Sequence, residues 1–299
     1  MKKVFILVLL IFILSSCKPQ ESISIMAPQG SPAMTVLGLD PDDYAIDIVN
    51  GPDPLIAAFG SASHDAIIAP TNLGAKLFQS KDDYQLAAIL VWGNYHLVST
   101  SYTTLTLEDL HGKDLVVFGR NQTSDIIIKH ILESYDIEAN ITYVDSVQLA
   151  AASYLADSTQ IVMVAEPSLS KIKTLIPSTA SLDLQAIYAE LHNGSSYPQA
   201  ALFVHQSMSK RAVLNLIDSL EQSIQWVNEK SEDVCQKGVE FGIIDDETMF
   251  MNAIEGSHLS LKTPDESLDS IHIYLNLILD INPNLIGGQI PIDAFYWSD

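Results

Sequence analysis

Apolar and polar positions along this chain follow two periods in turn, one typical of strands and one typical of helices. Short runs of β-branched and other apolar residues predict strands, at 23–27, 44–49, 65–69, 86–92 and 96–100. Helices are expected after the first three runs. Ser31-Pro32 and Asp53-Pro54 each place a capping residue before a proline, and 70–72 caps the third helix. Strands that alternate with helices favour an α/β fold with βαβ units and mainly parallel sheets.

A second unit of the same kind begins near residue 105. Its predicted strands lie at 114–119, 140–144, 161–165, 184–189 and 200–205, and its predicted helices at 106–110, 124–135 and 146–155. After residue 208 the pattern is almost entirely helical, at 209–229, 231–239, 245–253 and 265–280. The chain ends with Phe295, Tyr296 and Trp297, and three aromatic residues so close to a terminus predict that it docks onto the body.

The N-terminus carries a different pattern. Lys2 and Lys3 precede an apolar run over 4–14, which has the length of a secretory signal and falls short of the ~20 residues of a spanning helix. The following segment, 14–17, resembles the bacterial lipoprotein box. That resemblance implies a signal peptide over 1–16, a lipidated Cys17, a tether over 17–22 and a mature protein anchored outside the cytoplasm by acyl chains. A plain secretory signal with a chance cysteine is the alternative.

Composition agrees with a packed globular protein, because 47% of the residues are hydrophobic and only 17% are charged. The net charge of −22 becomes −24 once Lys2 and Lys3 are removed, since 13 Lys and Arg then face 37 Asp and Glu. Such a charge repels nucleic acid and anionic lipid headgroups. After lipidation of Cys17 only Cys235 remains as a thiol, which excludes an intrachain disulfide and a cysteine metal cluster. Cys235 is predicted to be buried in a helix.

Several short stretches occur in a characteristic order, at 29–33, 65–72, 107–113 and 287–291, followed by Phe295-Tyr296. In this order they resemble the type II extracytoplasmic solute-binding proteins of ABC importers, in the branch of nitrate, taurine, alkanesulfonate and thiamine-precursor receptors. The resemblance implies a periplasmic-binding-protein-like fold of two α/β lobes joined by two crossings. Lobe I would comprise 23–100 plus 201–299, lobe II would comprise 101–200, and the crossings would fall near 99–102 and 197–199.

Ligands of open α/β sheets bind beyond the carboxyl ends of the strands, where helix N-termini offer free N–H groups. Three turns of this kind provide candidate ligand-binding residues, namely Gln29, Gly30 and Ser31, then Thr71 and Asn72, then Asn121, Gln122, Thr123 and Ser124. The alternative is that Ser31, Thr71 and Thr123 only cap their helices, each contributing about 1 kcal/mol.

Further candidates lie near the predicted crossings. Trp92, Asn94, Tyr95 and Tyr197 combine aromatic and polar groups, as small-molecule clefts do, although Trp92 and Tyr95 could equally belong to the core. Glu166 follows a buried strand and could accept an N–H from a ligand, or instead be solvated or paired with a lysine.

Arg120 is the one arginine in a candidate turn. We expect it to point outward, which favours a neutral or modestly polar solute over an oxyanion.

The sequence offers no catalytic signature. Its histidines show no metal-ligand spacing, and it has neither a G-x-S-x-G elbow nor a P-loop. Nor is there the cysteine- and histidine-rich segment of the related precursor-synthesising enzymes. We therefore expect no catalytic residue, metal or cofactor.

The function that the resemblance implies is capture of a small solute by a lipid-anchored monomer. Its partners would be an ABC permease and its ATPase subunit, and the membrane through Cys17, with no nucleic acid. An extracytoplasmic ligand sensor, an envelope enzyme on the same scaffold and an adhesion lipoprotein are the alternatives.

Overall fold

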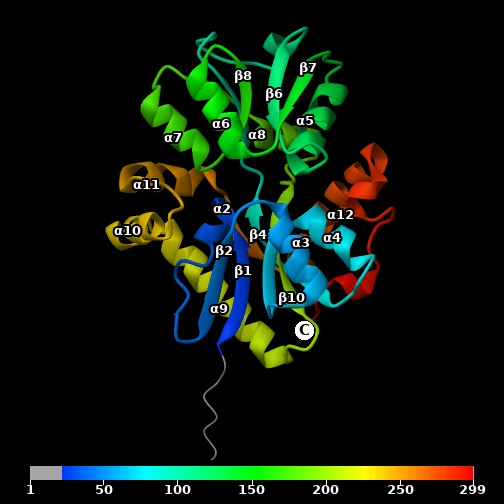
Figure 1. Ribbon diagram of the computed structural model, residues 1–299. Coiled ribbons are helices and arrows are strands. Elements are labelled where there is room, and N and C mark those ends of the chain that lie inside the picture. The colour runs from blue at the N-terminus through cyan, green and yellow to red at the C-terminus, as the bar shows by residue number, and fades with distance from the viewer. Residues whose placement is uncertain (1–21, 299) are drawn as a thin grey trace, which may run out of the picture.

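The computed structural model describes residues 22–298, so the signal sequence and Cys17 lie outside the described residues. The chain forms two β-sheets with helices on both faces of each (Figure 1). The larger sheet has six strands in the order β11-β4-β10-β3-β1-β2. Its strands are β1 (Ile23–Pro28), β2 (Tyr44–Val49), β3 (Ala66–Pro70), β4 (Tyr84–Trp92), β10 (Pro198–His205) and β11 (Leu259–Lys262). We call this sheet and its helices lobe I.

The smaller sheet has five strands in the order β7-β6-β8-β5-β9. Its strands are β5 (Tyr95–Ser99), β6 (Asp114–Phe118), β7 (Asn140–Val144), β8 (Ile161–Ala165) and β9 (Ala180–Asp183). We call this sheet and its helices lobe II. The predicted two-lobe α/β architecture is confirmed by this arrangement.

Both sheets are mixed, so the expectation of mainly parallel sheets is wrong. Within lobe I, β1 pairs in parallel with β2 and β3, whereas β10 runs antiparallel to β3 and β4. Within lobe II, β6 is parallel to β7 and β8, whereas β5 is antiparallel to β8 and β9. The reason is the crossing of the chain between lobes. β5 and β10 each begin at the cleft, where the strands of the βαβ units end.

Helices of lobe I form two layers. α3 (Pro52–Ser61), α4 (Thr71–Phe78) and α12 (Pro264–Ile281) share one hydrophobic core with one face of the sheet. The other face carries α2 (Ser31–Met34), α9 (Lys210–Asn228), α10 (Glu232–Glu240) and α11 (Glu247–Gly256). In lobe II, α5 (Thr123–Ser134) and α8 (Leu184–Leu191) cover one face, and α6 (Val147–Ala156) and α7 (Ser168–Leu175) cover the other.

The predicted strand over 184–189 is wrong, because this segment is the helix α8. The Asp183 carboxylate accepts hydrogen bonds from the backbone N–H groups of Gln185 and Ala186 and so caps the helix. Leu184, Ile187 and Tyr188 then bury one helical face. The short elements α7, β9 and β11 were not predicted at all, since four to eight residues carry little periodic signal.

The chain passes between the lobes twice. β4 ends at Trp92 in the larger sheet and β5 begins at Tyr95 in the smaller one, so the first passage lies at Gly93-Asn94. This is earlier than the passage near 99–102 expected from the sequence, and it assigns β5 to the sheet of lobe II. The second passage precedes β10, at Tyr197. That the two lobes are separate domains stays a prediction.

The C-terminus docks as predicted. Two 3₁₀ turns, η2 (Pro283–Ile286) and η3 (Asp293–Phe295), follow α12. Phe295 is fully buried, Tyr296 forms a bridge with Leu86 of β4, and the Trp297 backbone N–H donates to the Leu86 carbonyl at 2.9 Å. Cys235 is also buried as expected, in α10. Among residues 22–298, no helix combines the length and the apolar character needed to cross a membrane.

Candidate functional site

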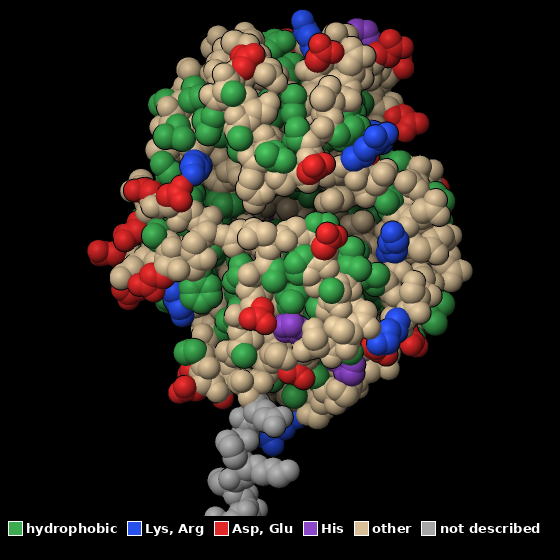
Figure 2. All heavy atoms as spheres, in the orientation of Figure 1, with side chains coloured by type: hydrophobic (Ala, Val, Ile, Leu, Met, Phe, Trp, Pro, Cys, Tyr) green, Lys and Arg blue, Asp and Glu red, His purple; other side chains and the backbone are tan. Residues whose placement is uncertain are grey.

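A cavity of about 630 Å³ lies between the two lobes. Figure 2 shows the surface hollowed at this level. Lobe I contributes the turns that follow β1, β2 and β3, and lobe II contributes those that follow β6, β7 and β8. The cavity therefore lies at the carboxyl ends of parallel strands from both sheets, where α/β proteins bind ligands.

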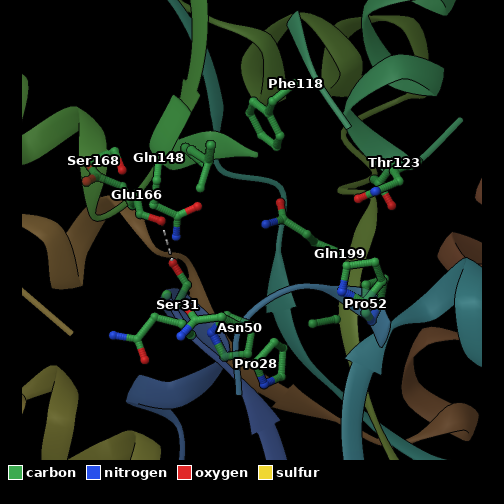
Figure 3. Close-up of a pocket in the computed structure, with 18 of the residues that line it drawn as sticks. Pro28, Ser31, Asn50, Pro52, Phe118, Thr123, Gln148, Glu166, Ser168 and Gln199 are labelled. Carbon is green, nitrogen blue, oxygen red and sulfur yellow. Dashed lines mark hydrogen bonds between the residues drawn. The ribbon is translucent and has the colours of Figure 1, made fainter. Parts of the chain in front are cut away.

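The structure brings most of the sequence-predicted residues to this cavity. The residues that line it are Gln29, Gly30, Ser31, Asn72, Tyr95, Asn121, Gln122, Thr123 and Glu166. The residues that do not are Thr71, Trp92, Asn94, Ser124 and Tyr197. Figure 3 shows Phe118, Thr123, Gln148 and Glu166 of lobe II on one side and Ser31, Asn50 and Pro28 of lobe I on the other.

Ser31 links the two lobes at the back of the cavity. Its buried hydroxyl lies 3.2 Å from the Glu166 carbonyl oxygen of lobe II, to which it donates (Figure 3). Asn94 lies behind it, where the Asn94 Nδ2 donates to Ser31 Oγ at 2.9 Å. The Asn94 Oδ1 in turn accepts from Gln199 Nε2 at 2.9 Å. Asn94 is thus a supporting residue that orients two cavity-lining side chains, rather than a lining residue itself.

Thr123 makes a second polar link between the lobes. Its hydroxyl lies 3.2 Å from Asn72 Oδ1 of α4 and 2.8 Å from the Tyr274 hydroxyl of α12. All three side chains are buried. Burial also raises the pKa of Tyr274, so its hydroxyl stays protonated and can take part as donor or acceptor. The first turn of α5 is therefore held against lobe I by hydrogen bonds.

We expect Thr123→Val to lower the free energy of unfolding by about 2 kcal/mol, because a shape-conserving side chain would leave Asn72 Oδ1 and the Tyr274 hydroxyl without this partner in a buried place. Thr123→Ser keeps the hydroxyl and is the matched control. Urea denaturation of the two variants measures the difference. Equal stabilities for Val and Ser would show that these bonds contribute nothing net.

Helix capping does not explain the three hydroxyl residues in these turns. Ser31, Thr71 and Thr123 are each the first residue of a helix, and the N-cap positions are Gly30, Pro70 and Gln122. None of the three helices has a side-chain cap hydrogen bond. The capping alternative is therefore wrong for these residues. Thr71 is fully buried, and within the described part of the chain its Oγ1 has no hydrogen-bond partner.

The core alternative holds for Trp92. Its Nε1 donates to the Ser260 carbonyl at 2.8 Å, and its side chain is buried between β4 and β11. Tyr197 is fully buried, and its hydroxyl accepts from the Tyr95 backbone N–H at 3.3 Å. The Tyr95 and Tyr197 rings lie 5.7 Å apart, so Tyr197 supports the aromatic residue that does line the cavity. Ser124 donates to the Phe118 carbonyl at 2.6 Å and closes the turn before α5.

The charged residues of the cavity fall into two groups. Lys171 of α7 forms an ion pair across the lobes with Asp245. Lys76 and Arg120 are exposed at the cavity edge, and among residues 22–298 neither forms an ion pair. The Arg120 guanidinium carbon lies 5.2 Å from the centre of the Tyr143 ring. Arg120 thus lies at the edge of the cavity with its guanidinium group on Tyr143, which does not line the cavity, and the outward orientation expected from the sequence stays a prediction.

Glu166 is neither solvated nor paired with a lysine. Its side chain is only 7% exposed, and the carboxylate accepts from the Ser170 backbone N–H at 3.1 Å and from the Ser170 hydroxyl at 3.0 Å. Burial raises the pKa of Glu166 to about 7. The structure therefore contradicts both alternatives for Glu166, exposure to solvent and pairing with a lysine.

Three carboxamide residues of the cavity were not predicted from the sequence, namely Asn50, Gln148 and Gln199. Asn50 follows β2 and Gln148 lies in the first turn of α6, after β7, so the carboxyl-end rule would have found both had it been applied to every strand. In the part of the chain that the structure describes, the side-chain amides of Asn50, Asn121, Gln122 and Gln148 form no hydrogen bond. Since a carboxamide both donates and accepts, these groups can bind a small polar molecule.

No cluster of three or more histidine, cysteine, aspartate or glutamate side chains that could hold a metal ion occurs between residues 22 and 298. The polar lining is instead dominated by amides and hydroxyls, with Tyr95 and Phe118 adding an aromatic pair whose ring centres lie 5.6 Å apart. The chemistry that this arrangement supports is reversible binding by hydrogen bonds and aromatic contact.

No protein-family model and no curated protein sequence matches this chain. Solved structures do. An ABC transporter protein from Parabacteroides distasonis is similar with a TM-score of 0.80 and 20% identity, over 93% of this chain and 99% of that one. The periplasmic aliphatic sulphonate binding protein SsuA from Escherichia coli gives a TM-score of 0.71 and 11% identity, over 94% of this chain and 93% of that one. The alkanesulfonate-binding protein SsuA from Xanthomonas axonopodis pv. citri, bound to MOPS, gives a TM-score of 0.66 and 13% identity, over 93% of this chain and 96% of that one.

At 20% identity and below, these similarities establish the fold. The chain has the two-lobe, periplasmic-binding-protein-like fold of ABC transporter solute-binding proteins, as the resemblance in its sequence implied. The cavity described above lies between the two lobes of that fold.

Proposed function

We propose that this chain is the solute-binding component of an ABC-type import system. It captures a small organic solute in the cavity between its lobes and delivers it to a permease that works with an ATPase subunit. The single observation that carries the proposal is the cavity of about 630 Å³ whose polar lining comes from both lobes. The shared fold supports it, because the similar proteins bear names of ABC transport and sulfonate binding.

The proposed mechanism is closure of the two lobes around the solute. In the open form the solute meets the unpaired carboxamides of one lobe, and closure adds those of the other. Ser31, Thr123 and Lys171 then form their contacts across the lobes. A solute drives this change only by as much as it prefers the closed form. No bond is made or broken, so we assign no catalytic residue.

The proposed location is the outer side of the cell membrane, where acyl chains on Cys17 hold a monomer close to the permease. This part rests on the sequence of residues 1–17. The strongly negative body is repelled by anionic lipid headgroups, which leaves attachment to the lipid anchor.

We expect one class of solute to raise the melting temperature of the purified protein, because a ligand that binds only the folded state stabilises it by about 2.7 kcal/mol at a hundred times its dissociation constant. Sulfonates, nitrate, pyrimidines, flavins and polyamines form the test panel, and native mass spectrometry of the same sample reports any solute that co-purifies.

The matched control is an Asn50→Ala/Gln148→Ala variant, which removes unpaired lining amides from both lobes and leaves the described hydrogen bonds intact. It should fold like the parent and lose most of the shift. Chemical turnover of the bound compound would favour an envelope enzyme on the same scaffold. A shift that the variant retains in full would place binding elsewhere and contradict the proposal.

A further inference from the structure

The Glu166 carboxyl group lies in the contact between the lobes. It belongs to lobe II, where both oxygens accept from Ser170 in the first turn of α7. Its other side faces Gly256, the last residue of α11 in lobe I. A methyl group added at Gly256 would lie only 2.7 Å from Glu166 Oε1 and 3.0 Å from Cγ, so the carboxyl side chain is in close contact with that helix. Part of its burial therefore comes from lobe I.

Among residues 22–298, no cation forms an ion pair with this carboxyl group. In α7, the helix that follows it, Glu166 contacts Ser170, and Lys173 acts only at a distance. On α11 the residue next to Gly256 is Glu255, which is exposed and pairs with Lys230 at 2.9 Å.

Two further residues of lobe I that the structure describes near Glu166 are neutral. They are Ser31, whose hydroxyl donates to the Glu166 carbonyl, and Ser257, whose hydroxyl lies 3.0 Å from that of Ser31. Closure of the lobes thus removes water from a carboxyl group and supplies no positive charge in exchange.

We propose that closure of the lobes is coupled to uptake of a proton by Glu166, so that acid favours the closed, solute-retaining form. The coupling rests on the proposed function, since it requires lobes that separate. Glu166 is then a group that regulates closure. This role does not require the contact between its carboxyl group and the solute that was expected from the sequence.

The direction follows from burial of the acid. With the lobes together, burial raises the pKa of Glu166 from its ordinary value of 4.5 to about 7. With the lobes apart, water reaches the carboxyl group and its pKa falls back toward the ordinary value. Between these two values the closed form binds a proton that the open form does not. Closure is therefore favoured below the higher pKa and loses this contribution as the pH rises through about 7, a change of about tenfold in the closure constant between pH 8 and pH 6.

The test is the distance between the lobes, measured by pulsed electron resonance on the full chain. Spin labels at Leu268→Cys in α12 of lobe I and Leu149→Cys in α6 of lobe II report on the distance between the lobes, since both residues are exposed and neither lines the cavity. Cys17→Ser and Cys235→Ala remove the other thiols. We expect the ratio of closed to open molecules to rise about tenfold from pH 8 to pH 6, without any solute.

Two variants separate Glu166 from other titrating groups. Glu166→Gln should hold the ratio constant over this range, at the value that the parent reaches in acid. Gly256→Ala places a methyl group 2.7 Å from Glu166 Oε1 and should lower the closed fraction at both pH values, so the contact between the lobes stays testable if Glu166→Gln does not fold. His96 lies near the passage, and burial lowers its pKa to about 4, below the range used. His130 and His192 lie within lobe II, and the Gln variant retains both.

The possible failures are distinct. Two distance populations whose ratio does not change with pH in the parent, or changes equally in Glu166→Gln, would overturn the proton coupling and leave the proposed function standing. A single distance in the parent and in both variants would show that the lobes do not move, and would overturn the proposed function together with the coupling.

Discussion

Gly93→Ala is expected to lower the free energy of unfolding by about 3 kcal/mol, at the upper end of the range for overpacking. Gly93 forms the first passage between the lobes, and a methyl group there would lie 2.1 Å from Gln185 Oε1 and 2.4 Å from ring carbons of Tyr197. The Tyr197 ring cannot move aside, because it is fully buried and contacts the rings of Tyr95 and Tyr188. The backbone of the passage must shift instead.

Urea denaturation measures this effect, and Gly60→Ala is its matched control. Gly60 lies inside α3, where nothing stands within 4 Å of an added methyl group. Alanine should therefore raise stability there, by up to about 1 kcal/mol, through its better helix propensity. If both alanine variants were as stable as the parent or better, the close contacts around Gly93 would have no energetic weight.

The strands of both sheets other than β9 and β11 could be predicted, because their burial leaves a clear signal in the sequence. The bounds predicted for β2, β7 and β8 agree with the structure at every residue. In β8 all five residues are buried, and such a continuous apolar run has few alternatives. The four long C-terminal helices were also found, since a helical period is evident over nine residues or more.

The α8 segment could not be assigned from its own sequence. Six consecutive residues with several apolar side chains fit a strand and a helix equally well. What decides is the Asp183 cap together with burial of Tyr188 against Tyr197, and the second of these depends on a residue outside the helix. The direction of the strands was not predictable from local sequence either. It depends on which strands follow the passages of the chain between the lobes.

The candidate site was predictable to the extent that it follows from topology. The turns after β1, β3 and β6 meet because parallel strands end at one edge, and this placed Ser31, Asn72 and Thr123 correctly at the cavity. The positions of Trp92 and Asn94 were not predictable in this way. Trp92 is withdrawn from the cavity by a hydrogen bond to Ser260, which is far away in the sequence. Local sequence carries no information on such a partner.

Phe203→Ala should lower the free energy of unfolding by about 4 kcal/mol, because it empties a place at the centre of the core of lobe I. Phe203 is 1% exposed, and its ring lies 5.5 Å from that of Phe59 and 6.1 Å from that of Phe295. It therefore joins β10 to α3 and to the docked C-terminus. Gly74 of α4 lies against the same ring, where an added methyl group would be 2.0 Å from Cζ.

The two positions together give a sharper test than either alone. Gly74→Ala by itself should cost about 3 kcal/mol by overpacking. In the double variant Gly74→Ala/Phe203→Ala the new methyl group enters space that the ring has left. The stability loss of the double variant should therefore be smaller than the sum of the two single-variant losses, by at least about 1 kcal/mol. Urea denaturation of the parent, both single variants and the double variant measures this coupling. Losses that add to within about 0.5 kcal/mol would mean that α4 does not rest on the Phe203 ring.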